Sequence, residues 1–152
     1  MQLINKLLTP GRTVCRAPGV SKKRLFETAA RIISNDQLSL PYEAIFSHLI
    51  AREKLGSTGL GKGIAIPHCR IGNCTHAMGA LITLEDPIQF DAPDGESVDI
   101  LFVLLVPEEA EQQHLDILAG IAGLFSQPDF CDALRAAQDT EALHFCATHW
   151  SS

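Results

Sequence analysis

The segment Val98–Val106, VDILFVLLV, constrains the fold of this chain more than any other stretch of its 152 residues. Apart from Asp99, every side chain in it is apolar. A strand with one face in water alternates apolar and polar residues, whereas a strand buried on both faces is apolar along its length. We therefore expect Val98–Val106 to lie within a sheet that other elements cover on both sides.

Further strands and helices are predicted around this segment. Strands are expected over Ile64–Ile66 and Ala77–Leu84, and Ala92-Pro-Asp-Gly95 has the residues of a turn. Helices are expected where apolar residues recur at helical spacing, after Ser21 as N-cap and after Pro41. The predicted helices cover residues 21–35, 41–56, 111–125, 128–137 and 140–149. This mixture predicts an α/β fold with a single mixed β-sheet flanked by helices on both faces, in one domain over residues 1–152.

The charge balance narrows the class of protein. The chain has 18 acidic and 12 basic residues, which give a formal net charge of −6. Proteins that bind nucleic acid normally carry a basic face, so this balance argues against that function. The longest basic run, Lys22-Lys23-Arg24, is expected on a solvent-exposed helix face.

The cysteines and the apolar runs predict the cellular location of the protein. Its five cysteines form no CxxC pair, which favours reduced thiols and a cytoplasmic location. The N-terminal residues lack the apolar stretch of a signal peptide, and the apolar run Ile100–Val106 is too short to span a bilayer. We therefore expect no direct membrane insertion.

His68 is the first candidate for chemistry, because an ionisable ring directly follows the apolar segment that ends in Pro67. An imidazole that accepts a phosphoryl group must be neutral, with one nitrogen free and hydrogen-bond donors around the product. The loop before it is rich in glycine but lacks the Walker A spacing. Either it is a flexible connector, or its backbone N–H groups and hydroxyls support an anion. The candidate supporting residues are Ser57, Thr58, Gly59, Gly61 and Gly63.

Two distant residues favour an anion site at His68. Arg52 shares a predicted helix face with Ile45 and Leu49, so it should point toward the protein body and need an anionic partner. That partner is either a transient anion or a permanent carboxylate in a structural ion pair. His114 lies near the start of a predicted helix on its apolar stripe, where it is either a core histidine or part of an anion site.

A metal site is the local alternative. The four residues His68, Cys69, Cys74 and His76 all have side chains that bind zinc. Their spacing lacks the usual Cys-x2-Cys pair, and two adjacent ligands would have to converge on one ion. Cys69 beside His68 also permits a catalytic thiolate, although no further motif supports it.

Residues 51–68, AREKLGSTGLGKGIAIPH, resemble the active-site signature of fructose/mannitol-type IIA proteins of the phosphotransferase system. They are most similar to the nitrogen-regulatory branch of that family, and the resemblance extends over nearly the whole chain. It includes Ser21-Lys-Lys-Arg24, Leu38-Ser-Leu-Pro41, residues 87–92, 98–107 and 134–138, and His114-Leu115.

The resemblance implies a phosphotransferase-system IIA component with a phosphohistidine intermediate and with no cofactor or metal. His68 would accept a phosphoryl group through Nε2 from a phosphorylated HPr-like carrier, with phosphoenolpyruvate as the ultimate donor. Arg52 and His114 would line the phosphohistidine. The resemblance also implies a mixed sheet flanked by helices.

The branches of the family differ in output. Relatives that transport sugars pass the group to a IIB protein, and the resemblance leaves this role, with a separate IIB protein as acceptor, as the alternative for this chain. The nitrogen-regulatory branch acts through its phosphorylation state on potassium-transport and sensor-kinase proteins. One position departs from the family, because Cys69 stands where glycine is common. Its side chain would narrow the site or make it redox-sensitive.

Overall fold

A computed structural model describes residues 2–19 and 21–151, and its centre is a six-stranded mixed sheet. The strand order is β1-β5-β6-β3-β2, and β4 also pairs with β6, beyond the end of β3. β5 and β6 are antiparallel, whereas β1 is parallel to β5 and both β3 and β4 are parallel to β6. The strands are β1 (Thr13–Ala17), β2 (Gly59–Gly61), β3 (Ile64–Ala65), β4 (His68–Ile71), β5 (Met78–Ile88) and β6 (Val98–Pro107).

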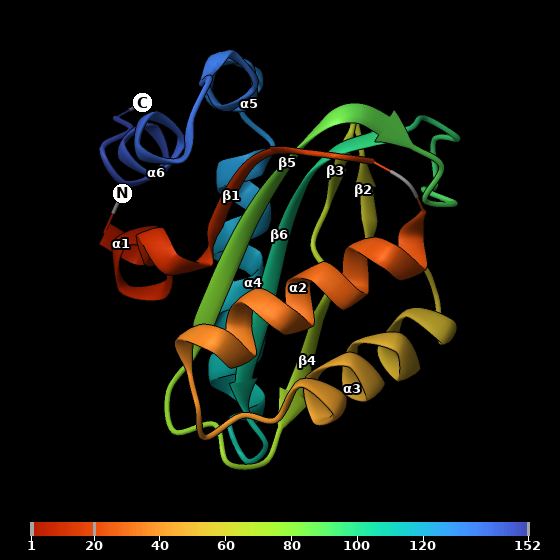
Figure 1. Ribbon diagram of the computed structural model, residues 1–152, viewed down its shortest axis with the longest axis vertical. Coiled ribbons are helices and arrows are strands. Elements are labelled where there is room, and N and C mark those ends of the chain that lie inside the picture. The colour runs from red at the N-terminus through yellow and green to blue at the C-terminus, as the bar shows by residue number, and fades with distance from the viewer. Residues whose placement is uncertain (1, 20, 152) are drawn as a thin grey trace.

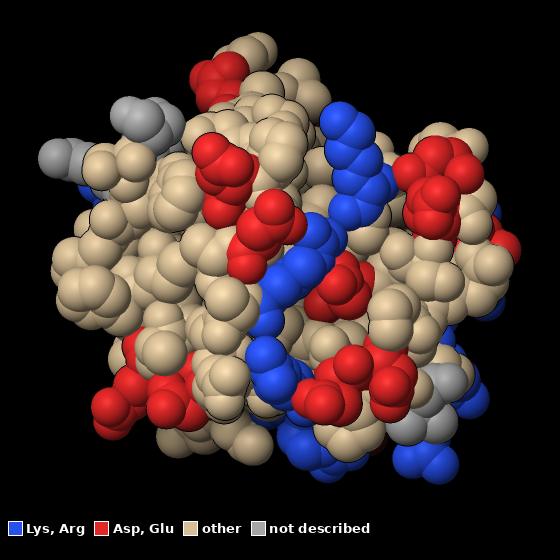
Figure 2. All heavy atoms as spheres, turned by 90° about the horizontal axis from the view of Figure 1, so that it is seen from above, with Lys and Arg blue, Asp and Glu red and all other residues tan. Residues whose placement is uncertain are grey.

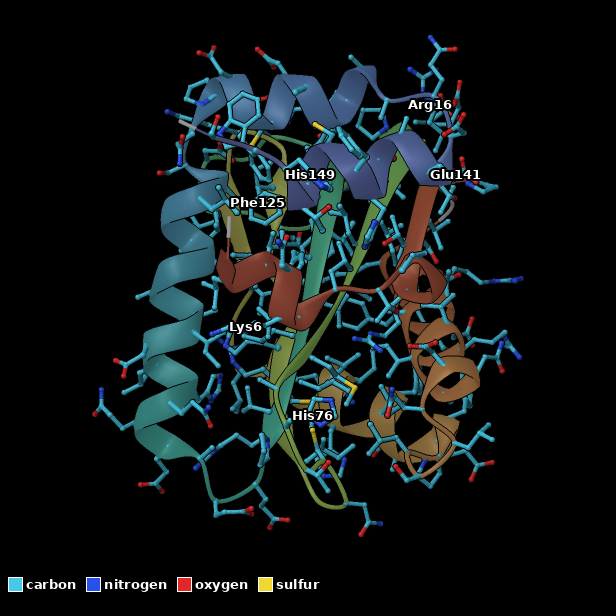
Figure 3. The ribbon with its side chains drawn as sticks, turned by 90° about the vertical axis from the view of Figure 1, so that its left-hand side faces the viewer. Lys6, Arg16, His76, Phe125, Glu141 and His149 are labelled. Carbon is cyan, nitrogen blue, oxygen red and sulfur yellow. The ribbon has the colours of Figure 1, made fainter. Side chains whose placement is uncertain are left out.

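Helices cover both faces of this sheet, as Figures 1 and 3 show. α2 and α3 pack on one face, and α4 lies on the other, with α1, α5 and α6 beside it. The predicted α/β class and the two-sided cover are therefore confirmed. The helices are α1 (Gln2–Leu7), the 3-10 helix η1 (Pro10–Arg12), α2 (Lys22–Asp36), α3 (Tyr42–Lys54), α4 (Glu111–Phe125), α5 (Pro128–Ala136) and α6 (Thr140–Thr148).

β6 supplies alternate side chains to both layers. Leu101, Val103 and Leu105 pack in the cluster beneath α2 and α3. Phe102 and Leu104 pack in the opposite cluster, which α1, α4, α5 and α6 cover. A strand contributes to two cores in this way only when both of its faces are apolar, so the prediction from Val98–Val106 is confirmed.

Five elements were not expected from the sequence. α1, η1 and β1 occupy an N-terminal region with no clear periodicity, and β4 begins at His68 itself. The predicted loop 57–63 contains β2, and the predicted strand from Ala77 extends to Ile88. Of these elements, β1 and β4 form because β5 and β6 offer hydrogen-bonding edges to short segments that lack a strong pattern of their own.

The start of α2 confirms one prediction and corrects another. Ser21 is the N-cap and accepts a hydrogen bond from the backbone N–H of Arg24, as expected. Lys23 and Arg24 of the basic run are exposed, as expected, but Lys22 is only partly exposed and its Nζ is 2.6 Å from the buried carboxylate of Glu53. The ammonium also donates to the Phe90 carbonyl and lies 4.4 Å from the centre of that ring.

The surface shows mixed charge rather than a broad basic face on the side seen in Figure 2, where a narrow strip of basic side chains is flanked by acidic ones. Within residues 2–19 and 21–151, no helix has the length and hydropathy that a membrane span requires.

We predict that Gly79→Ala destabilises the fold by about 1–3 kcal/mol through overpacking. A Cβ at Gly79 would lie 2.4 Å from Cζ of Phe102, whose ring is fully buried and has no free space to enter. Urea unfolding measures the change.

Gly123→Ala is the matched control, because a Cβ there has nothing within 4 Å. It lies inside α4, where alanine stabilises a helix by about 0.5–1 kcal/mol relative to glycine. Equal effects of the two substitutions would contradict the packing argument.

Candidate functional site

His68 lies at a break in the sheet edge. Pro67 separates β3 from β4, and its carbonyl accepts a hydrogen bond of 2.9 Å from Leu104 N–H of β6. Pairing with β6 therefore continues across the break. Side chains then alternate along β4, so that His68 and Arg70 are accessible while Cys69 and Ile71 are buried against α2 and α3.

The His68 ring has a defined tautomer. Its Nδ1 lies 2.7 Å from the carbonyl oxygen of Ile66. A carbonyl only accepts hydrogen bonds, so Nδ1 carries the hydrogen and Nε2 keeps its lone pair. Burial lowers the pKa of His68, and the Arg52 charge lowers it further, while the bond to Ile66 and the Glu53 charge raise it. The net lowering favours the neutral, nucleophilic ring at neutral pH.

His114 faces His68 from the first turns of α4. The two ring centroids are 5.3 Å apart with the planes at 69°. Nε2 of His114 is buried and has no hydrogen-bond partner among the described residues. Burial lowers the pKa of His114, with smaller contributions from His68, Arg70 and Arg52. His114 is thus not a satisfied core histidine but an unpaired group directed at the site.

Arg52 brings a positive charge to the same place from the last turn of α3. Ile45 and Leu49 on its helix face are buried, as predicted. The guanidinium donates through Nη1 to the Gly56 carbonyl at 2.9 Å. Among the residues described, no carboxylate lies within 4.0 Å of it, so the predicted alternative of a structural ion pair is wrong. Its charge is available to an incoming anion.

These groups share a depression of about 1010 Å³ between α3, β4 and α4, which we call the His68 cleft. Sequence reasoning missed Arg70, although its place two residues after His68 puts both on one side of a strand. Arg70 forms an exposed ion pair of 3.3 Å with Glu111 across the cleft. The lining residues are His48, Ala51, Arg52, Leu55, His68, Cys69, Arg70, Glu108, Glu111, His114 and Leu115.

The predicted supporting hydroxyls are engaged elsewhere in the structure. Thr58 Oγ1 donates to Glu53 at 2.6 Å, and Ser57 Oγ donates to the Phe90 carbonyl at 3.1 Å. Both residues line a smaller groove of about 370 Å³ that also contains His68. Their role toward an anion stays a prediction.

The glycines of the loop have structural reasons of their own. A Cβ at Gly59 would lie 2.7 Å from Cβ of Ala92. Gly61 and Gly63 have φ values of +93° and +87°, which side chains disfavour. Of the three, only Gly59 lines a hollow that His68 also lines. A role for Gly61 and Gly63 toward an anion therefore also stays a prediction.

The alternative zinc site is wrong. Within the described part of the chain, no group of three or more His, Cys, Asp or Glu side chains is placed to hold a metal ion. His68 and Cys69 occupy accessible and buried positions on opposite sides of β4. Cys74 Sγ donates to the His76 carbonyl at 3.1 Å, and Figure 3 shows His76 near the lower end of the sheet.

Cys69 packs in the core beneath α2 and α3. Burial, together with the neighbouring Cys74, raises the pKa of its thiol to about 12. A thiol of this kind forms little of the reactive thiolate at neutral pH. The structure therefore argues against the catalytic thiolate and against a redox-sensitive site at this position.

Within the part of the chain that the structure describes, the site contains a neutral imidazole with a free nitrogen, a second imidazole whose Nε2 is unpaired, and an arginine without a carboxylate partner. Such a set suits covalent attachment of a small anionic group to nitrogen. The fold and the site together suit a class of protein in which a histidine at the edge of a mixed sheet would accept such a group.

Comparison with known proteins places the chain more narrowly. Residues 6–146 match the family described as "Phosphoenolpyruvate-dependent sugar phosphotransferase system, EIIA 2". The nitrogen regulatory protein of Pseudomonas aeruginosa is 48% identical over 141 residues, which cover 93% of this chain and 92% of that protein. The nitrogen regulatory protein of Escherichia coli K12 is 42% identical over 143 residues, covering 93% and 85%. The chain belongs to the EIIA type-2 family of the phosphotransferase system.

Solved structures agree with this assignment. The crystal structure of nitrogen regulatory protein IIA-Ntr from Neisseria meningitidis has a TM-score of 0.87 at 43% identity, and the match covers 95% of this chain and 98% of that one. IIA mannitol from Escherichia coli shares the fold, with a TM-score of 0.74 at 12% identity over 91% and 97% of the two chains. The predicted resemblance to the nitrogen-regulatory branch is confirmed.

We predict that Arg52→Gln raises the pKa of both His68 and His114. The Arg52 charge disfavours a second positive charge nearby and lowers both values. Its removal therefore shifts both titrations to higher pH. NMR titration of the imidazole carbon-bound protons measures the change.

Arg70→Gln is the companion variant for this experiment. Arg70 lowers the pKa of His114 and is not among the causes that act on His68. It should raise the pKa of His114 while moving that of His68 less than Arg52→Gln does. A lower or unchanged pKa of His68 in Arg52→Gln would show that the guanidinium does not act on the ring.

Proposed function

We propose that this protein is a phosphocarrier whose His68 accepts a phosphoryl group on Nε2 from a phosphorylated HPr-like carrier protein. Phosphoenolpyruvate is the ultimate donor in this relay. The observation that carries the proposal is the 2.7 Å hydrogen bond from Nδ1 of His68 to the Ile66 carbonyl, which leaves the Nε2 lone pair free. Membership of the EIIA type-2 family supports the carrier role.

The transfer needs no proton to leave His68. The Nε2 lone pair forms the new bond to phosphorus, and the bond between phosphorus and the donor histidine nitrogen breaks. The bonding electron pair returns to that nitrogen of the donor. The His68 ring gains positive character, which the Nδ1–H bond to the Ile66 carbonyl stabilises. Catalysis of such a transfer depends mainly on positioning and on charge stabilisation.

Two residues compensate the charge of the phosphoryl group. Arg52 supplies N–H donors and a positive charge that is not paired with a carboxylate of the described residues. His114 donates to a phosphoryl oxygen from Nε2, the atom that is buried without a partner in the unphosphorylated protein. Both groups are in place before the reaction, so little reorganisation is required as charge develops.

The surface around the cleft suits a protein donor. Leu55 and Leu115 line the His68 cleft, and Leu60 lines the adjoining groove. These leucines are 85%, 60% and 48% exposed, respectively. Exposed leucines beside a reactive group are typical of a surface that another protein covers for a short time.

The proposed output is regulatory. The chain is similar over most of its length to proteins named nitrogen regulatory proteins. Phosphorylation adds nearly two negative charges at His68, which changes the surface that a target protein meets. By family resemblance we propose potassium-transport or sensor-kinase proteins as targets, with exchange taking place in the cytoplasm.

Phosphotransfer from phosphoenolpyruvate through purified upstream carriers tests the proposal. We expect an acid-labile, alkali-stable label on the wild type and none on His68→Gln. Arg52→Gln and His114→Gln should each slow labelling by about 10²–10³-fold, the usual effect of removing one donor to a developing charge.

His149→Gln is the control. His149 directly follows α6 and stacks on Phe145 of that helix, with ring centroids 4.0 Å apart. It lines neither the His68 cleft nor the smaller groove beside it. It should be labelled at the wild-type rate. Persistent label on His68→Gln would disprove the assignment of the acceptor.

A further inference from the structure

A buried carboxylate lies next to Arg52 in sequence but takes part in a different set of contacts. The Glu53 side chain is 7% exposed, and its Oε2 is 2.6 Å from Lys22 Nζ. Its two oxygens also accept from Thr58, which donates from Oγ1 at 2.6 Å and from the backbone N–H at 3.1 Å. A buried carboxylate is tolerated when it is paired and hydrogen-bonded in this way.

Two further hydrogen bonds connect this carboxylate to the reactive ring. The Thr58 carbonyl accepts from Ile66 N–H at 3.0 Å. The carbonyl of the same Ile66 accepts from Nδ1 of His68 at 2.7 Å. Thr58 is therefore bound to Glu53 through its N–H and hydroxyl, and to the residue that fixes the His68 tautomer through its carbonyl.

The same loop also holds Arg52. The guanidinium donates to the carbonyl of Gly56, two residues before Thr58. Arg52 and Glu53, successive residues at the end of α3, thus bind one short loop from two directions. Movement of Thr58 would therefore disturb both the arginine donor and the segment that orients His68.

We propose that Glu53 is a positioning residue for phosphoryl transfer, which acts on His68 through Thr58 and Ile66. This inference rests on the proposed function of His68. Glu53 does not touch the phosphoryl group. Its carboxylate holds Thr58 so that the Ile66 carbonyl remains in place to accept from Nδ1, and the free lone pair remains on Nε2.

The charge of Glu53 has a second effect on the same ring. It raises the pKa of His68, whereas burial and the Arg52 charge lower it. A nucleophile must be neutral yet retain basicity, and the best compromise places its pKa close to the working pH. Adjacent residues of opposite charge therefore act in opposite directions on the basicity of one imidazole.

A purely structural role for Glu53 makes different predictions. The Lys22–Glu53 pair joins α2 to α3, and its loss would lower stability without changing the His68 tautomer. The decisive readouts are therefore the tautomer of the neutral His68 ring and the pKa at which this ring becomes protonated. Nitrogen-15 NMR of the unphosphorylated protein measures both.

The test uses Glu53→Gln and Thr58→Val, with Thr58→Ser as the conservative variant. We expect the Nδ1–H tautomer in the wild type and a mixture of both tautomers in Glu53→Gln and Thr58→Val. Glu53→Gln should also lower the pKa of His68, because the charge that raises it is gone. Thr58→Ser keeps the hydroxyl and should match the wild type.

Kinetics supply a second readout. In metal sites, loss of a group that orients a functional histidine typically costs about 10–100-fold, so we expect phosphotransfer kcat to fall about tenfold or more in Glu53→Gln. The KM for the carrier should remain unchanged, since Glu53 is buried and is not part of the surface that the carrier would cover.

Asp36→Asn is the control for both readouts. Asp36 pairs with Arg12 and accepts a hydrogen bond from Thr9 Oγ1, and it does not line the His68 cleft. It should lower stability and leave both readouts of His68 unchanged.

The proposal would be overturned if folded Glu53→Gln and Thr58→Val both kept the wild-type tautomer and the wild-type pKa of His68, and a kcat within about twofold of the wild type. A twofold change in kcat corresponds to about 0.4 kcal/mol. If Glu53→Gln does not fold, Thr58→Val decides alone. Absence of phosphoryl transfer to the wild type would refute the proposed function, and the tautomer measurement would still decide whether Glu53 orients His68.

Discussion

The hydrogen bonding of β6 is the constraint on which the rest of the structure depends. β3, β4 and β5 all pair with this strand, and its alternate side chains fill the cores on both faces of the sheet. The interruption at Pro67 is harmless because proline has no N–H to satisfy, and its carbonyl still accepts from Leu104 of β6. His68, the proposed phosphoryl acceptor, thus lies at a discontinuity beside a continuous strand that is buried at every position except Asp99.

The electrostatics of the site follow from how three groups are placed around one ring. Burial favours the neutral form of His68, and Arg52 acts in the same direction from its exposed side. Glu53 acts in the opposite direction from beneath the loop. Within the described residues the arginine has no carboxylate partner and donates only to the Gly56 carbonyl, whereas the glutamate is paired with Lys22 and Thr58. One charge is therefore available to an incoming anion, and the other is committed to the protein.

Much of the fold was predictable because its strongest pattern is local. The apolar run of β6 and the capping serine of α2 act over short sequence distances, so the two-sided sheet and several helices follow from them. β1 and β4 have no such pattern and form only because β5 and β6 offer them an edge. His68, Arg52 and His114 were found from their neighbours in sequence and are near one another in the structure.

The contacts between distant elements were not predictable from local pattern. Lys22 was expected in solvent, because nothing near it in sequence shows that Glu53 is buried beside it. Arg70 was missed because β4 was not recognised as a strand. The glycines of loop 57–63 were interpreted either as part of a flexible connector or as support for an anion, but left-handed φ values account for Gly61 and Gly63, and close packing accounts for Gly59. A sequence pattern of glycines does not show whether the missing side chains leave room for a ligand or for close packing within the protein itself.

The alternation along β4 has a practical consequence at Cys69. Cys69 adjoins the phosphoryl-acceptor candidate in sequence, yet the residue is only 7% exposed and packs in the core that α3 covers. Because the sulfur is packed in this core, its modification by a bulky thiol reagent requires local opening of the structure around β4. The rate of modification of Cys69 therefore reports how often this part of the molecule opens.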